Sequence, residues 1–170
     1  MNFEPDSLRI EPLGPGHDRL VFRCGDERLD RYLREQASQD PRRGTARVFV
    51  AVSIDGPQRI LGYFTLSAAT VVPADEKRLP RHAIPAALVG RLAVEASVAR
   101  RGLGGLLLAD AVKKAAVAAE TVAMAVMVVD PIDERAEAFY AAFGFECLNG
   151  PRRRMFLALP FSRGGADSFA

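Results

Sequence analysis

The chain has 170 residues, of which 49% are hydrophobic and 26% are charged, and its formal net charge is +2. This length is most simply one domain, so we expect a single domain over residues 1–160 and a flexible tail over 161–170. The net charge is too small to predict a partner by itself. The sequence has only two cysteines, neither a basic nor an apolar stretch in its first residues, and no apolar run of about 18 residues. We therefore expect a cytoplasmic protein with no secretory leader, no metal site and no membrane span.

The first half of the chain predicts one helix among three strands. Apolar residues at helical spacing follow Asp26, a residue type that favours the N-cap, and Pro41 ends this helix at or before Asp40. Runs rich in β-branched residues predict strands, with a turn at residues 55–57 between two of them. The expected elements are strands over 8–13, 46–54 and 60–72, a helix over 26–40, and a proline-containing loop over 73–87.

The second half of the chain predicts two helices and four strands. Residues 87–94 are apolar and lead into a glycine-rich turn and an amphipathic helix. The continuous apolar run 122–129 is typical of a strand that is covered on both faces. Asp133 is expected to cap a short helix with Gly144 at its C′ position, followed by strands over 145–148 and 155–159. The order β-α-β-β-β-α-β-α-β-β predicts an α+β fold, a mixed and mostly antiparallel sheet between helical layers.

The turn that follows residues 87–94 carries the clearest chemical signal. Arg100 and Arg101 stand beside Gly102, Gly104 and Gly105, directly before the amphipathic helix. Glycine lets backbone N–H groups approach a ligand, and the first-turn N–H groups of a helix lack acceptors at its positive end. Such a turn suits a phosphate or pyrophosphate. A plain strand–turn–helix connection fits the glycines equally well, but packing alone does not require the two arginines.

Three segments resemble the GNAT N-acetyltransferase family: residues 92–94, 101–106, and 133–145 with its Phe-Tyr-x-x-x-Gly-Phe pattern. Gly102 and Gly104 fill the two small positions of the family's Gln/Arg-x-x-Gly-x-Gly/Ala signature, whereas Ala99 departs from its first position. The resemblance implies a GNAT fold and acetyl-CoA as co-substrate, and leaves open whether Arg100 or Arg101 replaces the missing contact. The implied cofactor-binding residues are Leu92, Ala93, Val94, Arg100, Arg101, Gly102, Leu103, Gly104, Gly105, Leu106, Asp133 and Phe139.

A narrower resemblance is to the acetyltransferase toxins of type II toxin–antitoxin systems. It rests on Phe22-x-Cys24-Gly25, Leu29-Asp30-x-Tyr32-Leu33, Ala37-x-Gln39-Asp40-x-Arg42-Arg43, Arg47-Val48-Phe49-Val50, Gly62-Tyr63-Phe64-Thr65-Leu66-Ser67 and Arg91-Leu92-Ala93-Val94. Members of that group acetylate the α-amine of aminoacyl-tRNA and stop translation. The resemblance therefore implies aminoacyl-tRNA as acceptor, an antitoxin partner with a ribbon-helix-helix domain, and a homodimer.

Tyr140 is the side chain best suited to catalysis. A phenol within reach of the departing CoA sulfur can stabilise or protonate it. An aromatic residue at helical spacing also commonly packs in a core, and the resemblance favours the catalytic role. No residue stands out as a dedicated base, since Glu95 beside the strand at 92–94 is more simply a surface carboxylate. A free α-amine has a pKa of about 7.7–8.0 and lysine about 10.4, so an aminoacyl ester needs the least help to react.

Basic residues form several clusters that suit an RNA backbone, whose binding is mainly phosphate neutralisation. A solvated surface explains any single cluster as well. The expected RNA-binding residues are Arg42, Arg43, Arg47, Lys113, Lys114, Arg152, Arg153 and Arg154. Two other functions stay open at this point. One is a GNAT enzyme that acts on a small amine or a protein amine, and the other is a CoA-binding module without catalytic activity.

Overall fold

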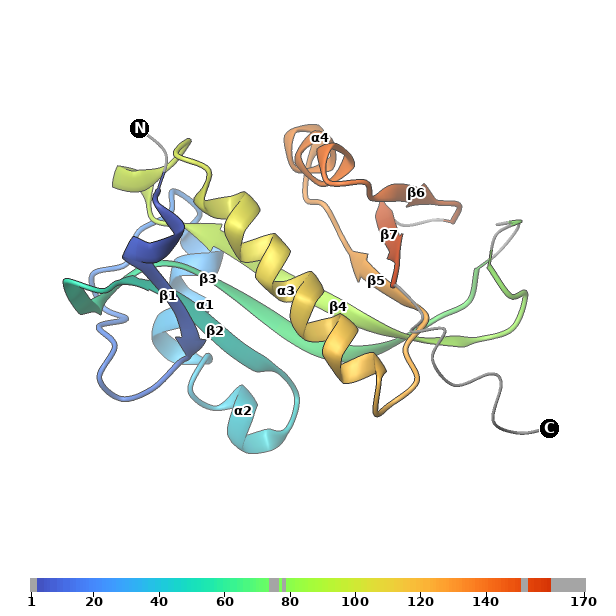
Figure 1. Ribbon diagram of the computed structural model, residues 1–170, viewed down its shortest axis with the longest axis horizontal. Helices are drawn as coiled ribbons and strands as arrows, with labels where there is room; N and C mark the ends of the chain where they lie inside the picture. Colours follow the sequence, from blue (N-terminus) through green and yellow to red (C-terminus); the bar gives the residue numbers. More distant parts are fainter. Residues whose placement is uncertain (1–2, 74–76, 78, 151–152, 160–170) are drawn as a thin grey trace. The chain divides into compact units, whose positions relative to one another are not determined.

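A seven-stranded sheet carries the fold, and its strands are hydrogen-bonded in the order β1-β2-β3-β4-β5-β7-β6 (Figure 1). The computed structural model describes residues 3–73, 77, 79–150 and 153–159. The strands are β1 (Leu8–Pro12), β2 (Arg47–Ser53), β3 (Gly56–Val71), β4 (Ile84–Val94), β5 (Val126–Val129), β6 (Glu146–Leu148) and β7 (Arg154–Ala158). The helices are α1 (Glu27–Glu35), α2 (Asp40–Arg43), α3 (Leu103–Ala119) and α4 (Glu134–Ala142), with single 3₁₀ turns η1 (Pro5–Ser7) and η2 (Ala96–Val98).

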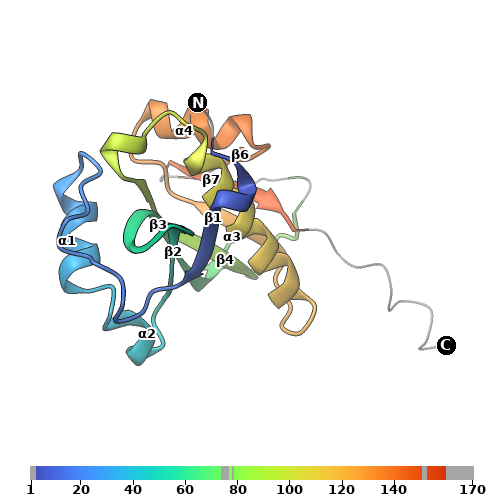
Figure 2. The ribbon, with the colours of Figure 1, turned by 60° about the vertical axis from the view of Figure 1, so that its left-hand side comes forward.

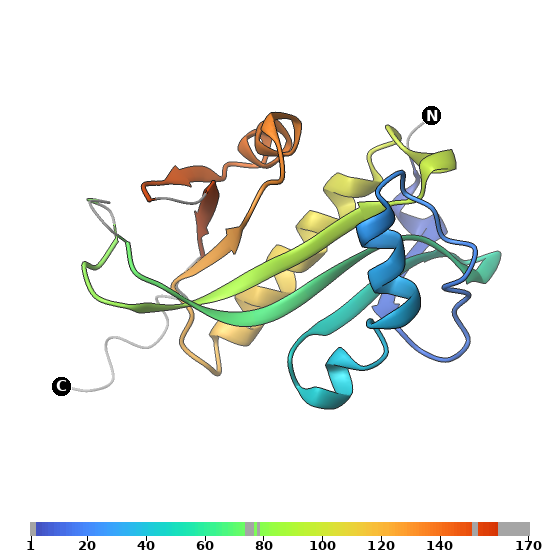
Figure 3. The ribbon, with the colours of Figure 1, turned by 180° about the vertical axis from the view of Figure 1, so that it is seen from behind.

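The chain divides into two compact units, and the first comprises Met1–Ser67 and Val89–Ala111. In this unit β1 pairs antiparallel with β2, and β2 pairs antiparallel with β3. α1 and α2 follow each other along one face of these strands, and the first half of α3 covers the other face (Figures 1, 2 and 3). Between the strands and α1 lies a core that includes Phe22, Tyr32, Leu33, Val50 and Tyr63.

The second unit comprises Ala68–Leu88 and Val112–Ala170. Here β7 pairs antiparallel with both β5 and β6, and all four residues of β5 are buried. The core on this side includes Val71, Ile84, Val126, Val128 and Phe156. No helix in the described part of the chain is long and apolar enough to cross a membrane.

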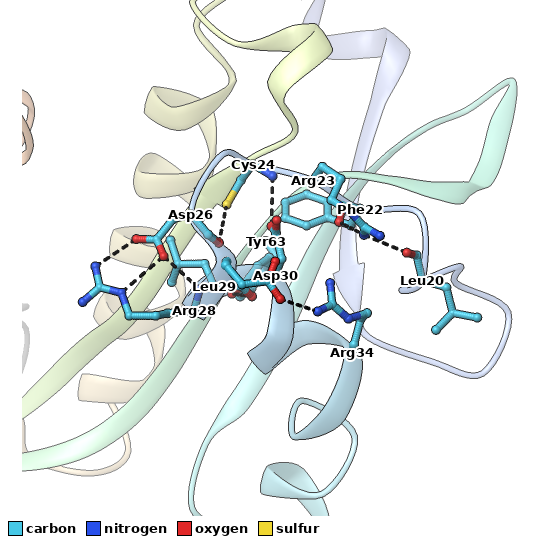
Figure 4. A network of polar contacts seen from close by, with 11 residues as sticks. Leu20, Phe22, Arg23, Cys24, Asp26, Arg28, Leu29, Asp30, Arg34 and Tyr63 are labelled. Carbon is cyan, nitrogen blue, oxygen red and sulfur yellow. Dashed lines mark hydrogen bonds and ion pairs between the residues drawn. The ribbon is translucent and has the colours of Figure 1, made fainter.

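Local chemistry explains where α1 begins. Asp26 has extended backbone angles and its side chain accepts the Arg28 N–H at 2.9 Å, which satisfies one of the unpaired donors of the first turn. The Asp30 carboxylate accepts the Cys24 N–H at 2.9 Å, and the Tyr63 hydroxyl donates to the Leu29 carbonyl at 2.8 Å (Figure 4). These bonds fix the segment before α1 to the helix and to β3.

The end of α4 follows the predicted glycine signal. Gly144 has a φ of +90°, so it takes the left-handed conformation that favours glycine. Its N–H donates to the Ala141 carbonyl at 3.0 Å, and the Phe145 N–H donates to the Tyr140 carbonyl at 3.2 Å. This pair of bonds is a Schellman motif, and Phe145 is buried immediately after it.

The predicted α+β fold with a mixed sheet flanked by helices is confirmed. Several boundaries were wrong. Residues 84–87 belong to β4 and not to the loop, Gly56 starts β3 although we expected it in a turn, and β5 begins at Val126 and not at 122. α1 ends at Glu35, earlier than the expected bound at residue 40, and Pro41 lies in the first turn of α2, a helix that we did not predict. The expected tail over 161–170 lies outside the described residues.

Candidate active site

The end of β4 supplies a short, well-anchored strand in the first unit. Ala93 is buried in the core with Tyr32 and Tyr63, whereas Leu92 and Val94 are half-buried. Two backbone bonds hold the chain directly after the strand, from the Glu95 N–H to the Leu61 carbonyl and from the Ala96 N–H to the Arg23 carbonyl, both 2.8 Å. These two bonds therefore fix the backbone directly after residues 92–94, before the turn begins.

Glu95 has a structural task that its sequence position did not indicate. Its Oε2 accepts the Ser97 N–H at 3.0 Å, which caps η2, and also accepts the Ser97 hydroxyl and an Arg59 N–H. The side chain is 13% exposed, so it is not the surface carboxylate that we expected. Glu95 thus shapes the start of the turn that leads to α3.

The turn itself has the geometry of an anion site. Arg100 and Gly102 both have positive φ values, +62° and +83°, on either side of Arg101. The first α-helical bond runs from the Leu106 N–H to the Gly102 carbonyl at 3.2 Å. Within the described residues no acceptor binds the N–H groups of Leu103, Gly104 and Gly105. These groups line the positive end of α3, where a phosphate is favourable.

The two arginines of the turn differ in what they do. Arg101 places its guanidinium carbon 4.3 Å from the centroid of the Phe3 ring, and its carbonyl accepts the Phe3 N–H at 3.4 Å. It therefore holds the N-terminal segment against the turn. Arg100 is exposed and has a left-handed backbone that costs about 1 kcal/mol or more in a residue with a side chain. Such a conformation is typical of functional turns.

The second unit brings together Asp133, Phe139 and Tyr140 on α4. The Asp133 carboxylate caps the helix by accepting the Ala136 N–H at 2.8 Å. Phe139 and Phe145 contact the Tyr140 ring with centroid distances of 5.1 and 5.6 Å. Burial raises the pKa of Tyr140 to about 12, and no described residue forms a hydrogen bond with its hydroxyl. At neutral pH this phenol is a protonated donor without an acceptor among the described residues.

The basic residues fall into groups with different surroundings. Arg42 and Arg43 end α2, and Arg47 begins β2, so three exposed arginines lie within one short segment of the first unit. Lys113 is exposed and Lys114 is half-buried on the second half of α3. Arg153 pairs with Glu137 at 3.1 Å, and Arg154 pairs with both oxygens of Asp130 at 2.7 and 2.8 Å. These ion pairs reduce the charge of the third group, and Arg152 lies outside the described residues.

One residue near the strand edge had no predicted role. Arg91 stacks its guanidinium carbon 3.7 Å from the centroid of the Tyr32 ring. Both residues belong to the segments that carried the toxin resemblance, but no chemistry was assigned to either. The available signal was a charged residue inside an otherwise apolar strand, which is unusual for a position that faces a core.

A mixed sheet in which β4 leads through a glycine-rich turn into α3 matches the GNAT class of acyl-CoA-dependent acyltransferases. The chain belongs to the acetyltransferase (GNAT) family, whose defining pattern matches residues 17–145. It is 35% identical over 133 residues to a tRNA-acetylating toxin of Mycobacterium tuberculosis (strain ATCC 25618 / H37Rv), which covers 76% of this chain and 78% of that protein. It is 30% identical over 164 residues to the probable toxin TacT of Sinorhizobium fredii (strain NBRC 101917 / NGR234), with 88% and 90% covered.

Solved structures of toxins share the fold. A tyrosine-to-phenylalanine mutant of KacT superposes with a TM-score of 0.83 at 28% identity, covering 90% of this chain and 95% of KacT. AtaT complexed with acetyl-methionyl-tRNAfMet has a TM-score of 0.82 at 27% identity, with 89% and 94% covered. AtaTR bound with AcCoA has a TM-score of 0.79 at 28% identity, with 91% and 95% covered.

Proposed function

We propose that this protein is a toxin that transfers an acetyl group from acetyl-CoA to the α-amine of aminoacyl-tRNA and thereby blocks translation. The observation that carries the proposal is the likeness to AtaT, solved with acetyl-methionyl-tRNAfMet, over almost the whole chain. The relative named a tRNA-acetylating toxin, at 35% identity, supports the same acceptor. Acetylation removes the nucleophilic amine that peptide-bond formation requires.

The turn after β4 holds the acetyl-CoA diphosphate in this proposal. The unpaired N–H groups of Leu103, Gly104 and Gly105 donate to the phosphate oxygens, and Arg100 supplies the cation. Arg100 is favoured over Arg101 as the replacement for the family's residue at Ala99, because the Arg101 guanidinium already stacks on Phe3. The edge at Leu92–Val94 is proposed to pair with the pantetheine amides, and Leu106, Asp133 and Phe139 are further proposed contacts.

Acetyl-CoA supplies an activated acyl thioester. A backbone N–H of Leu92–Val94 would stabilise the negative charge that develops on the carbonyl oxygen. The C–N bond from the neutral amine forms as the C–S bond breaks, the amine loses its proton to solvent, and CoA leaves as a thiolate whose sulfur accepts a hydrogen bond from the Tyr140 hydroxyl. The raised pKa of Tyr140, about 12, keeps this donor protonated throughout the physiological range. Since the phenol is a weaker acid than a thiol, it acts mainly through the hydrogen bond.

The acceptor and partners follow from the same proposal. Arg42, Arg43 and Arg47 would meet the RNA backbone from the first unit, with Lys113, Lys114, Arg152, Arg153 and Arg154 as further contacts. Complexes of AtaT with AtaR and of KacTA with DNA support a neutralising antitoxin for this protein. We propose a ribbon-helix-helix antitoxin, a homodimeric toxin and a cytoplasmic site of action, where charged tRNA is found.

The test is acetylation of a charged tRNA mixture in the presence of acetyl-CoA, measured as CoA release and as mass gain on the aminoacyl ester. The wild-type protein is expected to act on charged tRNA and to leave uncharged tRNA unmodified. Tyr140→Phe is expected to bind acetyl-CoA with unchanged affinity and to lower kcat by about 10²–10⁴-fold. Full turnover in this variant would remove Tyr140 from the mechanism.

Two other outcomes would replace the proposal. Strong acetylation of polyamines or protein amines with no action on charged tRNA would identify a GNAT enzyme with another acceptor. Acetyl-CoA binding without turnover on any amine would identify a binding module. The same CoA-release assay separates all three functions, because only the acceptor changes between its arms.

A further inference from the structure

Arg91 is a charged residue placed against the core side of β4. Side chains alternate between the two faces of a strand, so Arg91 lies on the same face as Ala93, which packs in the core beside α1. Its guanidinium carbon stands 3.7 Å from the centroid of the Tyr32 ring, well within the range of a cation–π contact. This contact holds the guanidinium over the face of the Tyr32 ring.

Tyr32 is itself held rigidly. It is 2% exposed, its hydroxyl donates to Asp40 Oδ2 at 2.6 Å, and its ring lies nearly parallel to that of Tyr63, 19° apart with centroids at 6.2 Å. The other carboxylate oxygen, Asp40 Oδ1, accepts the Thr45 hydroxyl at 3.2 Å. The Tyr32 side chain under Arg91 therefore has its hydroxyl hydrogen-bonded and its ring held in one position.

The guanidinium is not satisfied in the same way. Arginine carries five N–H donors. Within the described part of the chain, the Arg91 guanidinium forms no ion pair and no hydrogen bond, although the residue is half-buried. The carboxylates of Asp40 and Asp30 already have other partners, since Asp40 accepts from the Tyr32 and Thr45 hydroxyls and Asp30 accepts the Cys24 N–H. The fold thus holds the Arg91 guanidinium in place while none of its N–H groups donates to a described residue. This is the arrangement expected of a ligand-binding arginine.

Its position along β4 indicates which ligand. Arg91 precedes the proposed oxyanion strand Leu92–Val94, while the proposed diphosphate site at Arg100–Gly105 follows that strand beyond η2. The three residue-to-residue steps from Arg91 to Val94 span about 10 Å of strand. Arg91 is therefore at the acetyl end of the strand, away from the anions of acetyl-CoA, and its anion belongs to the acceptor.

We propose that Arg91, stacked on Tyr32, binds the phosphate of the acceptor's terminal nucleotide and positions the aminoacyl ester for transfer. This inference rests on the proposed function. The phosphate nearest to the reactive amine of an aminoacyl-tRNA is the 5′-phosphate of its terminal adenosine. A planar guanidinium with its donors at the edge matches the geometry of two phosphate oxygens.

The experiment compares two small acceptors, 3′-aminoacyl-adenosine with and without a 5′-phosphate, together with charged tRNA. The measured quantity is the ratio of kcat/KM with the phosphate to kcat/KM without it. In the wild type this ratio is expected to be about 10–100, the effect of one hydrogen bond to a charged group. In Arg91→Gln it is expected to fall to near 1, and Arg91→Lys is expected to give an intermediate ratio.

Arg31→Gln is the matched control, because Arg31 is an exposed arginine on α1 and its loss should leave the ratio at the wild-type value. A wild-type ratio near 1 would overturn the proposal. So would an Arg91→Gln variant in which kcat/KM falls by the same factor for both esters, and Arg91 would then have a structural role. Should Arg91→Gln fail to fold, the Arg91→Lys ratio decides, and an unchanged ratio would overturn it. A wild type that acetylates neither charged tRNA nor either ester would instead refute the proposed function.

Discussion

Replacing Gly102 with alanine tests separately how the turn before α3 affects the stability of the fold and the proposed binding of acetyl-CoA. Gly102 has a φ of +83°, and no described heavy atom beyond its chain neighbours lies within 4 Å of the position that a Cβ would take. The cost in stability is therefore conformational, about 1–2 kcal/mol for a left-handed residue with a side chain. Alanine also lowers the conformational entropy of the unfolded chain, which offsets this cost by about 0.4–1 kcal/mol. The net loss of about 1 kcal/mol predicts a fall in Tm of about 2–4 °C.

The effect on acetyl-CoA should be larger than the effect on stability. The added methyl group occupies the open side of the turn, where phosphate oxygens would approach the N–H groups of residues 103–105. Losing one hydrogen bond to a charged ligand costs about 1.5–3 kcal/mol, which raises the Kd by about 10–100-fold. Calorimetric titration with acetyl-CoA gives the Kd, and thermal unfolding gives the Tm of the same sample.

Gly44→Ala is the matched control. Gly44 has a φ of +70°, and no described heavy atom beyond its chain neighbours lies within 4 Å of its Cβ position, but it caps α2 far along the chain from the turn. The control is expected to lower the Tm by a similar amount and to leave the Kd unchanged. Equal acetyl-CoA affinity in Gly102→Ala and the wild type would refute the assignment of this turn to the diphosphate.

Three further changes test other parts of the structure. Arg100→Gly relieves a left-handed arginine, so the Tm should stay level or rise while acetyl-CoA binds more weakly; a lower Tm with unchanged affinity would contradict this. Asp133→Ala removes the α4 cap and should lower the unfolding free energy by about 1 kcal/mol in chemical denaturation, whereas an unchanged value would show that the cap does not contribute. Hydrogen bonds from His17 and Arg9 lower the pKa of Glu11, so its stabilisation is present above its usual pKa of 4.5 and is lost as the pH falls through its lowered folded value. In Glu11→Gln the unfolding free energy should therefore fall less steeply below pH 5. The same pH dependence in both proteins would show that the Glu11 carboxylate does not contribute.

Much of the fold could be predicted because its strongest elements have clear patterns. The run that became β5 is apolar throughout, and α4 has both its cap and its terminal glycine in sequence. The errors have tertiary causes. Pro85 lies inside β4 because its carbonyl accepts the Ala125 N–H at 2.9 Å, a pairing that local propensity does not contain. A proline that usually ends a helix can also begin the next one, as Pro41 does in α2.

The candidate site was predicted as a motif and not as a geometry. Spacing identified the glycines, but it does not give the positive φ of Arg100 or the stacking of Arg101 on Phe3. Both depend on how distant segments meet. Arg91 and Tyr32 are 59 positions apart in the chain, so their contact cannot be seen from local pattern, although a lone charge within an apolar strand was a usable signal.

The way the turn before α3 is anchored determines how the protein should respond to its co-substrate. Val98 and Leu103, at 8% and 1% exposure, fix both ends of a span whose residues 99, 100 and 102 are exposed. A short segment tied at both ends has little conformational entropy left to lose. The acetyl-CoA site should therefore be preformed. Binding should then have a favourable enthalpy and cost the protein little conformational entropy. Amide exchange in this turn should slow on binding only where an N–H gains a phosphate acceptor, without wider protection of the surrounding chain.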